Sequence, residues 1–140
     1  MNHQLSSDVL AASQFAVPIT AATTTPSAGV DTLGYRRAVA VFHSLPTGSG
    51  TTSDCKLQQS SDDGVGDAYA DVSGAAFTQV TTAGGVKLQM MEIDLAKRER
   101  YLKLLHTGAG GSAAGAASGI ILLFRGAQTA PTQSSTDISV

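Results

Sequence analysis

The chain has 140 residues, the usual length of one compact domain, and its formal net charge at pH 7 is −2. Only 14% of the residues are charged, 5% are aromatic and none is tryptophan, so the composition provides no basic surface for nucleic acid and few rings for stacking on sugars. The single cysteine, Cys55, excludes an internal disulfide. We expect a surface so poor in charge to be buried in part within an assembly.

The N-terminal residues 1–28 are predicted to form an extended arm outside the folded domain. The stretch AVPITAATTTPSAGV is uncharged, has no helical stripe and is interrupted by Pro18 and Pro26. Proline and β-branched threonine both favour extended backbone. Such an arm can add a strand to the edge of a neighbouring subunit's sheet.

From Tyr35 onward the sequence consists of short alternating runs separated by turn residues, which predicts strands. RRAVAVFHSL, CKLQQSS, AYADV, AAFTQVTT, VKLQMMEIDL and the apolar run IILLF each fit a strand. In VKLQMMEIDL the alternation changes phase at Met91, which predicts a β-bulge. The small-residue stretch TGAGGSAAGAASG, which ends at Gly119, is predicted to be a long surface loop.

One segment, AKRERYLKLL, allows two structures. Leu95, Tyr101, Leu102 and Leu105 fit one face of a helix, for which Asp94 would be the N-cap. The stretch RYLKLLH also fits a strand that follows a short turn. We favour the strand because the neighbouring segments are strands.

About seven or eight short antiparallel strands, at a regular spacing with turn signals between them, predict an all-β fold, a β-sandwich of the jelly-roll type. We assign the sandwich to residues 29–126, between the arm at 1–28 and a polar C-terminal tail at 127–140. No basic segment followed by an apolar block occurs near the N-terminus, so we expect no signal peptide and a protein that is made in a cytosol and either stays there or is packaged from it. The longest apolar run, Gly119–Phe124, is too short to cross a bilayer.

Four aspartates, Asp62, Asp63, Asp67 and Asp71, are clustered in the stretch SSDDGVGDAYADVSG. They do not fit an EF-hand, because Asp62 and Asp63 are adjacent and no glutamate stands at the twelfth position. The pair Asp63-Gly64 instead predicts the turn of a β-hairpin, since both residue types tolerate positive φ. A cation bound between the loops remains as the alternative.

No arrangement of residues in the sequence predicts catalysis or a cofactor. The letters G-x-G-x-x-A starting at Gly108 match a dinucleotide fingerprint, but no βαβ context surrounds them and a Walker lysine is absent. His3, His43 and His106 are scattered, without the spacing of a zinc site. A G-x-S-x-G nucleophile motif is also absent. We therefore predict no enzymatic activity, no cofactor and no metal.

Four segments follow one another in the chain: VDTLGYRRAVAVF, KLQQSSDDGVGDAYADVSGAAFT, EIDLAKRERYLKLLHTGAGG and GIILLFRG. They resemble a D-T-x-G-Y opening with its first core strand, a Q-x-S-x-D-G hairpin, a D-x-x-x-R-x-R-Y segment and a closing strand. In this order the segments resemble the head decoration (cement) proteins of tailed bacteriophages and related prophage proteins. The motifs are short and degenerate, so the resemblance depends on their order, and it covers about residues 30–126.

The resemblance implies a structural β-sandwich subunit that binds the outer capsid surface of the virion as a homotrimer, after assembly in the cytoplasm of the bacterial host. The implied partners are the major capsid protein and further copies of the chain, with no nucleic acid and no membrane. We predict that the contacts come from apolar residues of the arm and from a basic cluster, namely Phe15, Val17 and Ile19 with Lys97, Arg98, Arg100 and Lys103.

Two other functions compete with this one. The chain could be another virion component, in the tail or the head–tail connector, which would differ from a cement protein in its copy number per particle. It could also be a carbohydrate-binding or receptor-binding module. Sugar platforms require exposed aromatic residues, and this chain has no tryptophan and three tyrosines, so we rank that function lower.

Overall fold

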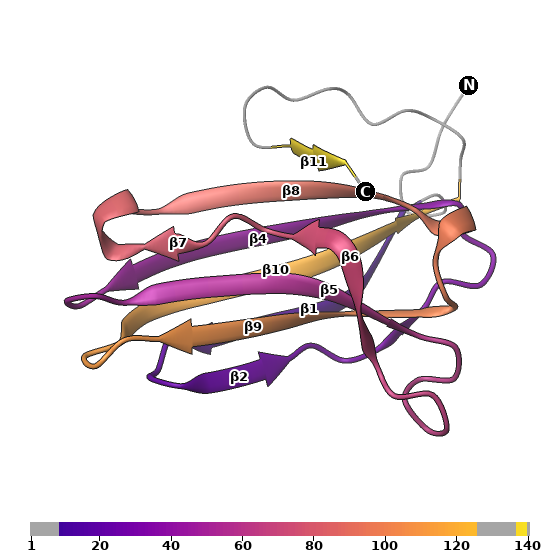
Figure 1. Ribbon diagram of the computed structural model, residues 1–140. Helices are drawn as coiled ribbons and strands as arrows, with labels where there is room; N and C mark the ends of the chain where they lie inside the picture. The colour runs from indigo at the N-terminus through magenta and orange to yellow at the C-terminus, as the bar shows by residue number, and fades with distance from the viewer. Residues whose placement is uncertain (1–8, 126–136, 140) are drawn as a thin grey trace.

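The computed structural model describes residues 9–125 and 137–139, in which two β-sheets pack face to face as a sandwich (Figure 1). The predicted all-β sandwich is confirmed. Among the described residues, no helix is long and apolar enough to cross a membrane. The elements are β1 Val9–Pro18, β2 Thr23–Pro26, β3 Val30–Asp31, β4 Arg37–Thr47, β5 Thr52–Ser60, β6 Ala70–Ala76, β7 Val80–Thr81, η1 Thr82–Gly84, β8 Lys87–Asp94, η2 Leu95–Lys97, β9 Tyr101–Ala109, β10 Ala114–Phe124 and β11 Asp137–Ser139.

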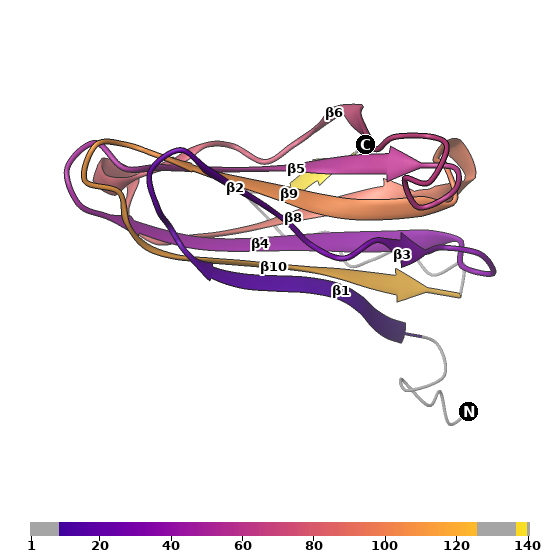
Figure 2. The same ribbon diagram turned by 90° about the horizontal axis from the view of Figure 1, so that it is seen from below.

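The strands are wound as a jelly roll, as predicted. One sheet, called here the β4 sheet, has the order β1-β10-β4-β8-β11; the other, the β5 sheet, has the order β2-β9-β5-β6, with β3 beside β9 and β7 beside β5. The antiparallel pairs β1–β10, β2–β9, β4–β8 and β5–β6 are nested along the chain, which is therefore one long hairpin wrapped into two layers (Figure 2). Only β11, which runs parallel to β8, departs from antiparallel pairing among the described strands.

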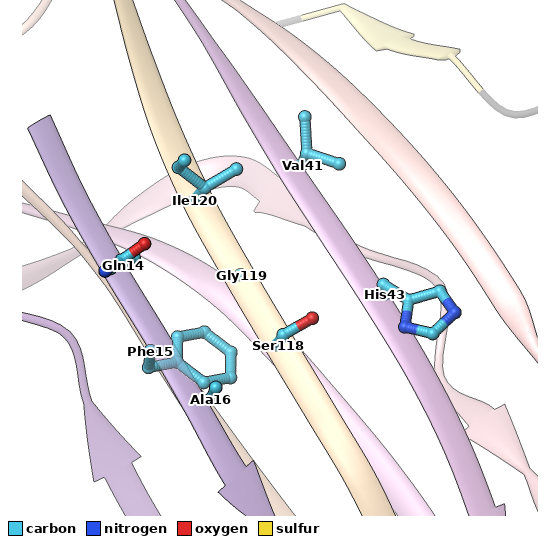
Figure 3. A pocket seen from close by; sticks show the side chains of 8 residues that line it. All are labelled: Gln14, Phe15, Ala16, Val41, His43, Ser118, Gly119 and Ile120. Atoms are coloured by element: carbon cyan, nitrogen blue, oxygen red, sulfur yellow. The ribbon is translucent and has the colours of Figure 1, made fainter. Parts of the chain in front are cut away.

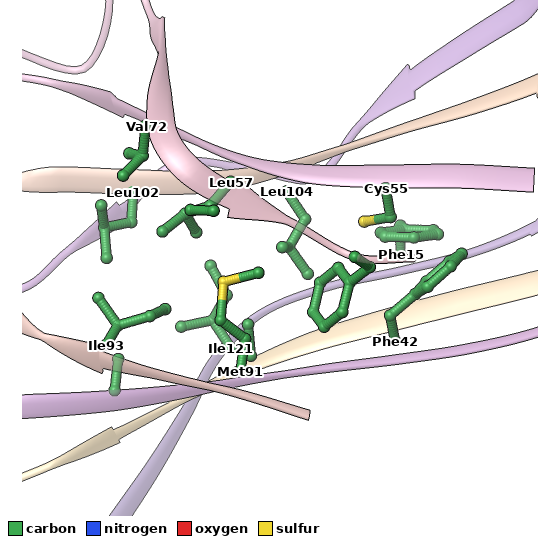
Figure 4. Packing of buried hydrophobic residues seen from close by; sticks show 14 of the residues in the cluster. Phe15, Phe42, Cys55, Leu57, Val72, Met91, Ile93, Leu102, Leu104 and Ile121 are labelled. Carbon is green, nitrogen blue, oxygen red and sulfur yellow. The ribbon is translucent and has the colours of Figure 1, made fainter. Parts of the chain in front are cut away.

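The core lies between the sheets and consists of alternate residues of the long strands. On β4, Ala38, Ala40 and Phe42 are fully buried, while Val39 and Val41 between them face outward. Burying a large apolar side chain such as that of Phe42 contributes roughly 1.5–3 kcal/mol to the stability of the fold. The other long strands follow the same rule (Figure 4), and their fully buried side chains include Leu57, Met91, Ile93, Leu102, Leu104, Ile121 and Leu123.

The N-terminal segment belongs to the sandwich, and this corrects the prediction of a separate arm. Its backbone is extended, as expected, but β1 pairs along its length with β10 and β2 pairs with β9. Phe15 and Ile19 are only 7% and 1% exposed. The free edge of β10 is available within the same chain, so the strand pairs there. Residues 1–8 lie outside the described part.

The C-terminal tail is described only in part. Asp137–Ser139 forms β11, which pairs with β8 at the edge of the β4 sheet, whereas we had expected a loose polar tail. Residues 127–136 and 140 lie outside the described residues.

The predicted bulge at Met91 is wrong, because β8 pairs with β4 in one unbroken register. Gln89 faces the core together with Met91, and its side-chain amide exchanges hydrogen bonds with the backbone of Thr78 at 2.8 and 2.9 Å. Leu88 and Met90 face outward. The change of phase in the sequence therefore reflects apolar residues on both faces of β8.

Two further predictions concern the segment between residues 95 and 119. The strand alternative for RYLKLLH is confirmed, since η2 ends at Lys97 and β9 follows. The small-residue stretch is mostly strand, contrary to the predicted loop, and only residues 110–113 connect β9 to β10. Its glycines allow close packing of the strands: a Cβ on Gly115 would lie 2.1 Å from the carbonyl oxygen of Leu45 on β4.

Gly119 stands directly opposite Phe15 in the pairing of β10 with β1. A Cβ on Gly119 would lie 2.4 Å from Cε1 of Phe15 and 2.9 Å from Cδ1 of Leu104. The absence of a side chain at this position is therefore what lets the Phe15 ring enter the core.

A buried polar cluster crosses the core near the same ring. Ser44 donates a hydrogen bond to Oγ of Ser53 at 2.7 Å, and Oγ of Ser53 lies 2.9 Å from Nε2 of His106. The imidazole stacks on the ring of Phe15 with centroids 5.5 Å apart. Its Nδ1 is buried without a hydrogen-bond partner among the described residues. Burial lowers the pKa of His106, against a smaller opposing effect of the Asp54 carboxylate.

We expect Gly119→Ala to lower the free energy of unfolding by about 1–3 kcal/mol, because the added methyl group overpacks the core. Gly111→Ala is the matched control, since a Cβ there meets nothing within 4 Å, and it should change stability by no more than about 0.5 kcal/mol. Urea unfolding monitored by circular dichroism measures both variants. Equal effects at the two positions would contradict this account of Gly119.

The buried His106 predicts a pH dependence of stability. Its folded-state pKa lies below its ordinary value of 6.5, so the unfolded chain binds the proton more readily. Stability is complete above pH 6.5 and decreases as the pH falls below it, by at most about 1.4 kcal/mol per pH unit. Urea unfolding between pH 7.5 and about 5 measures this slope, which we expect His106→Gln to reduce. Exposed His43→Gln serves as the control and should leave the slope unchanged.

Candidate functional site: the outer face of the β4 sheet

Most outward-facing side chains of the β4 sheet are apolar, and together they form a surface called here the apolar face. The outward ion pair of Arg37 with Glu92 lies beside Val39 at one end of it. The strand register places Ile120 of β10 between Gln14 of β1 and Val41 of β4, with Met90 of β8 beyond. Leu88 is 56% exposed and Leu45 is 42% exposed. The apolar face consists of Ala16 and Pro18 on β1, Val39, Val41 and Leu45 on β4, Leu88 and Met90 on β8, and Ala116, Ile120, Leu122 and Phe124 on β10.

A shallow hollow of about 420 Å³ opens in the apolar face where β1, β10 and β4 lie side by side (Figure 3). It exists because Ala16, Ser118 and Gly119 are small, while Ile120 and His43 rise beside them. An amide, a hydroxyl and an imidazole line it, with no carboxylate or thiol. Ser118 and His43 are partners in the register of β10 with β4, so a hydroxyl and an imidazole stand side by side in the lining. The lining can accept a side chain of a partner and hydrogen-bond its polar atoms.

The outer face of the β5 sheet is polar, and its charges are engaged within the chain. The Asp71 carboxylate accepts hydrogen bonds from Lys56 and Gln58 at 2.6 and 2.7 Å. Gln79 donates to both carboxylate oxygens of Asp54. The hydrogen bonds from Lys56, which has the larger effect, and from Gln58 lower the pKa of Asp71. The two faces therefore differ sharply, and the apolar one is suited to being covered by another molecule.

The predicted contact residues Phe15, Val17 and Ile19 point into the sandwich, not outward. Phe15 and Ile19 belong to the core cluster, and Val17 packs against it. This corrects the prediction: the three residues stabilise their own domain, and the outward positions of the same strand are Gln14 and Ala16. Strand alternation could have identified this, had the segment been read as a strand of the domain.

The predicted basic cluster, Lys97, Arg98, Arg100 and Lys103, is not one unpaired patch. Lys97 lies 3.7 Å from the Asp94 carboxylate, and Nζ of Lys103 lies 3.9 Å from the centroid of the Tyr69 ring. Arg98 is half-buried. That these four residues contact a capsid stays a prediction.

Arg100 is held by a carboxylate of its own chain. Its guanidinium donates two hydrogen bonds to Asp31, at 3.0 and 2.6 Å. These bonds, with one from the backbone N–H of Leu33, lower the pKa of Asp31. Because Asp31 lies on β3, the pair joins that short strand to the start of β9. Exposed pairs of this kind contribute little to stability, so the pair mainly fixes geometry.

The aspartate loop between β5 and β6 is a turn, as predicted, since Asp63 and Gly64 have φ of 62° and 81°. The Asp62 carboxylate accepts hydrogen bonds from the backbone N–H groups of Val65, Gly66 and Asp67 at 2.6–3.1 Å. These bonds lower the pKa of Asp62. The carboxylate oxygens of Asp62 are therefore occupied by hydrogen bonds from the backbone of the loop.

The other aspartates of this cluster are also engaged. Asp63 accepts a hydrogen bond from the Tyr69 hydroxyl, and Asp67 accepts one from the backbone N–H of Ser61. The described residues contain no group of three potential metal ligands. Cys55 is buried on the inner face of β5, and burial raises the pKa of its thiol, so it packs as a core residue.

Comparison with models of known protein families finds no match. Comparison with the sequences of curated proteins finds none either. Among solved structures, the chain is similar to the PBSX exported protein XepA, with TM-score 0.58 and 14% identity over 97% of this chain and 43% of XepA. It is less similar to a carbohydrate-binding module specific for non-crystalline cellulose, with TM-score 0.49 and 9% identity over 82% of this chain and 74% of that one.

A structure of the infectious bursal disease virus Gx strain matches with TM-score 0.47 and 14% identity, over 86% of this chain and 32% of that one. The chain thus spans less than half the length of the viral protein and of XepA. At 14% sequence identity, the similarity to XepA shows a similar fold and nothing more.

We expect the stability of the aspartate loop to be independent of cations, because its carboxylates are bonded to its own backbone. Calcium or EDTA at millimolar concentration should leave the melting temperature unchanged. Asp62→Ala should lower it, whereas Asp62→Asn, which keeps an acceptor oxygen, should lower it less. A calcium-dependent rise in the melting temperature of the wild-type chain would contradict this.

Proposed function

We propose that the chain is a non-enzymatic structural subunit of a tailed-phage virion that binds the outer capsid surface as a decoration (cement) protein. The observation that carries the proposal is the apolar face. Large exposed apolar patches on soluble proteins mark surfaces that bind other molecules. Covering residues such as Leu88 and Ile120 with a partner contributes roughly 1.5–3 kcal/mol for each side chain that is fully buried.

The four segments that resemble decoration proteins occupy coherent places in the fold, which supports the proposal. The D-T-x-G-Y segment leads into β4, and the Q-x-S-x-D-G segment forms the end of β5 and the aspartate loop. The D-x-x-x-R-x-R-Y segment covers η2 and the start of β9, and the closing segment is the end of β10. The four segments therefore contribute strands to both sheets of one domain.

The composition of the apolar face favours a protein partner over a sugar. Its outward residues are mainly aliphatic, and Phe124 is its aromatic member. The Phe15 ring that lines the hollow is 7% exposed and points into the core. Sugar-binding platforms use exposed aromatic rings, whereas aliphatic surfaces pack against other proteins.

Substitution of Ile120 tests the proposal. Ile120→Lys places a charge in the middle of the apolar face and should weaken binding to empty shells of the phage's major capsid protein by roughly tenfold or more, because the charge would be buried without a partner. Thr107→Lys, at an outward position of β9 on the opposite face, is the matched control and should bind like the wild type. Cosedimentation with the shells measures both.

Two results would count against the proposal. Failure of the wild-type chain to bind shells would exclude decoration of the capsid. Equal weakening by the two lysine substitutions would exclude the apolar face as the docking surface. The copy number on intact particles separates the alternatives, since a cement protein is present in hundreds of copies and a tail or connector protein in far fewer. The resemblance implies trimers on the shell, and electron cryo-microscopy of decorated particles tests this.

A further inference from the structure

β1 forms one edge of the β4 sheet and has an open side. It pairs with β10 on one side, and no described strand pairs with it on the other. In Figure 2 it lies at the margin of the molecule. An edge strand presents a row of free N–H and C=O groups, which can pair with another extended strand.

The backbone groups on the open side can be identified. The N–H of Ile19 donates to the carbonyl of Gly115 at 3.0 Å, so this group points toward β10. Backbone groups alternate sides along a strand with a period of two residues, so Phe15 and Val17 also point toward β10. The N–H and C=O groups of Gln14 and Ala16 therefore point to the open side.

The other described edges carry features that hinder pairing. The part of β1 from Gln14 to Val17, called here the open half of β1, does not. β2 has four residues and ends in Pro26, and β11 has three. β6 carries the charged Asp71 and pairs with β5 in a shifted register. β1 has ten residues, no charge, and a proline only at its last position. Short length, charge, proline and bulges are the usual protections of sheet edges.

The open half of β1 is also held firmly in place. The register of β1 shifts between Ala11 and Ser13, and the Ser13 hydroxyl then reaches across to the segment that follows β2. It donates to the carbonyl of Ala28 at 2.6 Å and lies 2.8 Å from Oγ of Ser27. Beyond this shift the strand is regular up to Pro18. A strand fixed in this way loses little conformational freedom when it pairs.

We propose that two copies of the chain pair antiparallel through β1, with the Gln14–Ala16 segment of each copy hydrogen-bonded to the same segment of the other. A second copy fits this edge because an antiparallel edge is complementary to itself about a two-fold axis, and a two-fold contact closes without leaving a new edge. The absence of charge on β1 removes repulsion between the two copies. The pairing joins the two β4 sheets, and their apolar faces, into one continuous surface.

This contact is two-fold, in contrast to the three-fold assembly that the sequence resemblance implies. It does not depend on capsid binding. The edge groups that form it lie in the plane of the sheet, whereas Ile120 and its neighbours project from the apolar face. The two proposals can therefore fail separately.

The mass of the full-length protein in solution tests the pairing. We expect light scattering after size-exclusion chromatography to give the mass of two chains for the wild type. Ala16→Pro removes an N–H from the open side but none from the β10 ladder, a position at which an edge strand tolerates proline. It should give the mass of one folded chain. Ala16→Val keeps the N–H and should remain a dimer, with the fold of each variant checked by circular dichroism.

Hydrogen exchange of the wild-type chain provides a test that needs no variant. In the dimer the amides of Gln14 and Ala16 should be protected together with those of Phe15 and Val17. On dilution the first pair should lose protection while the second keeps it. A wild-type mass of one or three chains, or a dimer in which Gln14 and Ala16 exchange freely, would overturn the proposal. A dimer of Ala16→Pro would do the same.

Discussion

The structure depends on the pairing of β1 with β10, which brings the two ends of the described domain together and closes the jelly roll. That pairing requires Gly119, because the Phe15 ring enters the core at the position that a side chain on Gly119 would occupy. The ring then packs on His106 and so reaches the serine pair between the sheets. One glycine opposite one aromatic ring thus couples strand pairing, core packing and the buried polar cluster.

The same pairing of β1 with β10 also builds the apolar face. β10 lies between β1 and β4, so its outward residues Ile120 and Leu122 adjoin apolar residues on both sides. The small residues Ala16 and Ser118 hollow this surface, and His43 is the imidazole in its lining. Elsewhere, Asp62 accepts hydrogen bonds from backbone N–H groups, and Asp31 and Asp71 pair with basic side chains. The apolar face therefore offers a partner apolar surface to bury and a few groups for hydrogen bonds.

Several differences between expectation and structure have a common physical cause. Strand alternation predicts which residues share a face, but it does not say which face is covered. In β8, Leu88 and Met90 face outward while Gln89 faces inward and satisfies its amide on Thr78, so the run appeared to contain a bulge. Residues 1–28 were predicted to be an arm outside the domain, so Phe15 and Ile19, which face the core, were assigned to contacts with another subunit. Both errors arise because the sequence does not show which side of an extended segment the rest of the chain covers.

The sequence by itself determined the fold class and the turn at Asp63-Gly64, because these follow from local alternation and from backbone preferences at single residues. For RYLKLLH it allowed a helix or a strand, and the strand was favoured because the neighbouring segments are strands. Only the tertiary structure decided that residues 9–26 belong to the two sheets, that the basic residues are paired with Asp31 and Asp94, and that one face of the sandwich is apolar. These features depend on which distant segments become neighbours. The sequence does not encode that at any single position, since strand pairing is set by the packing of the whole chain.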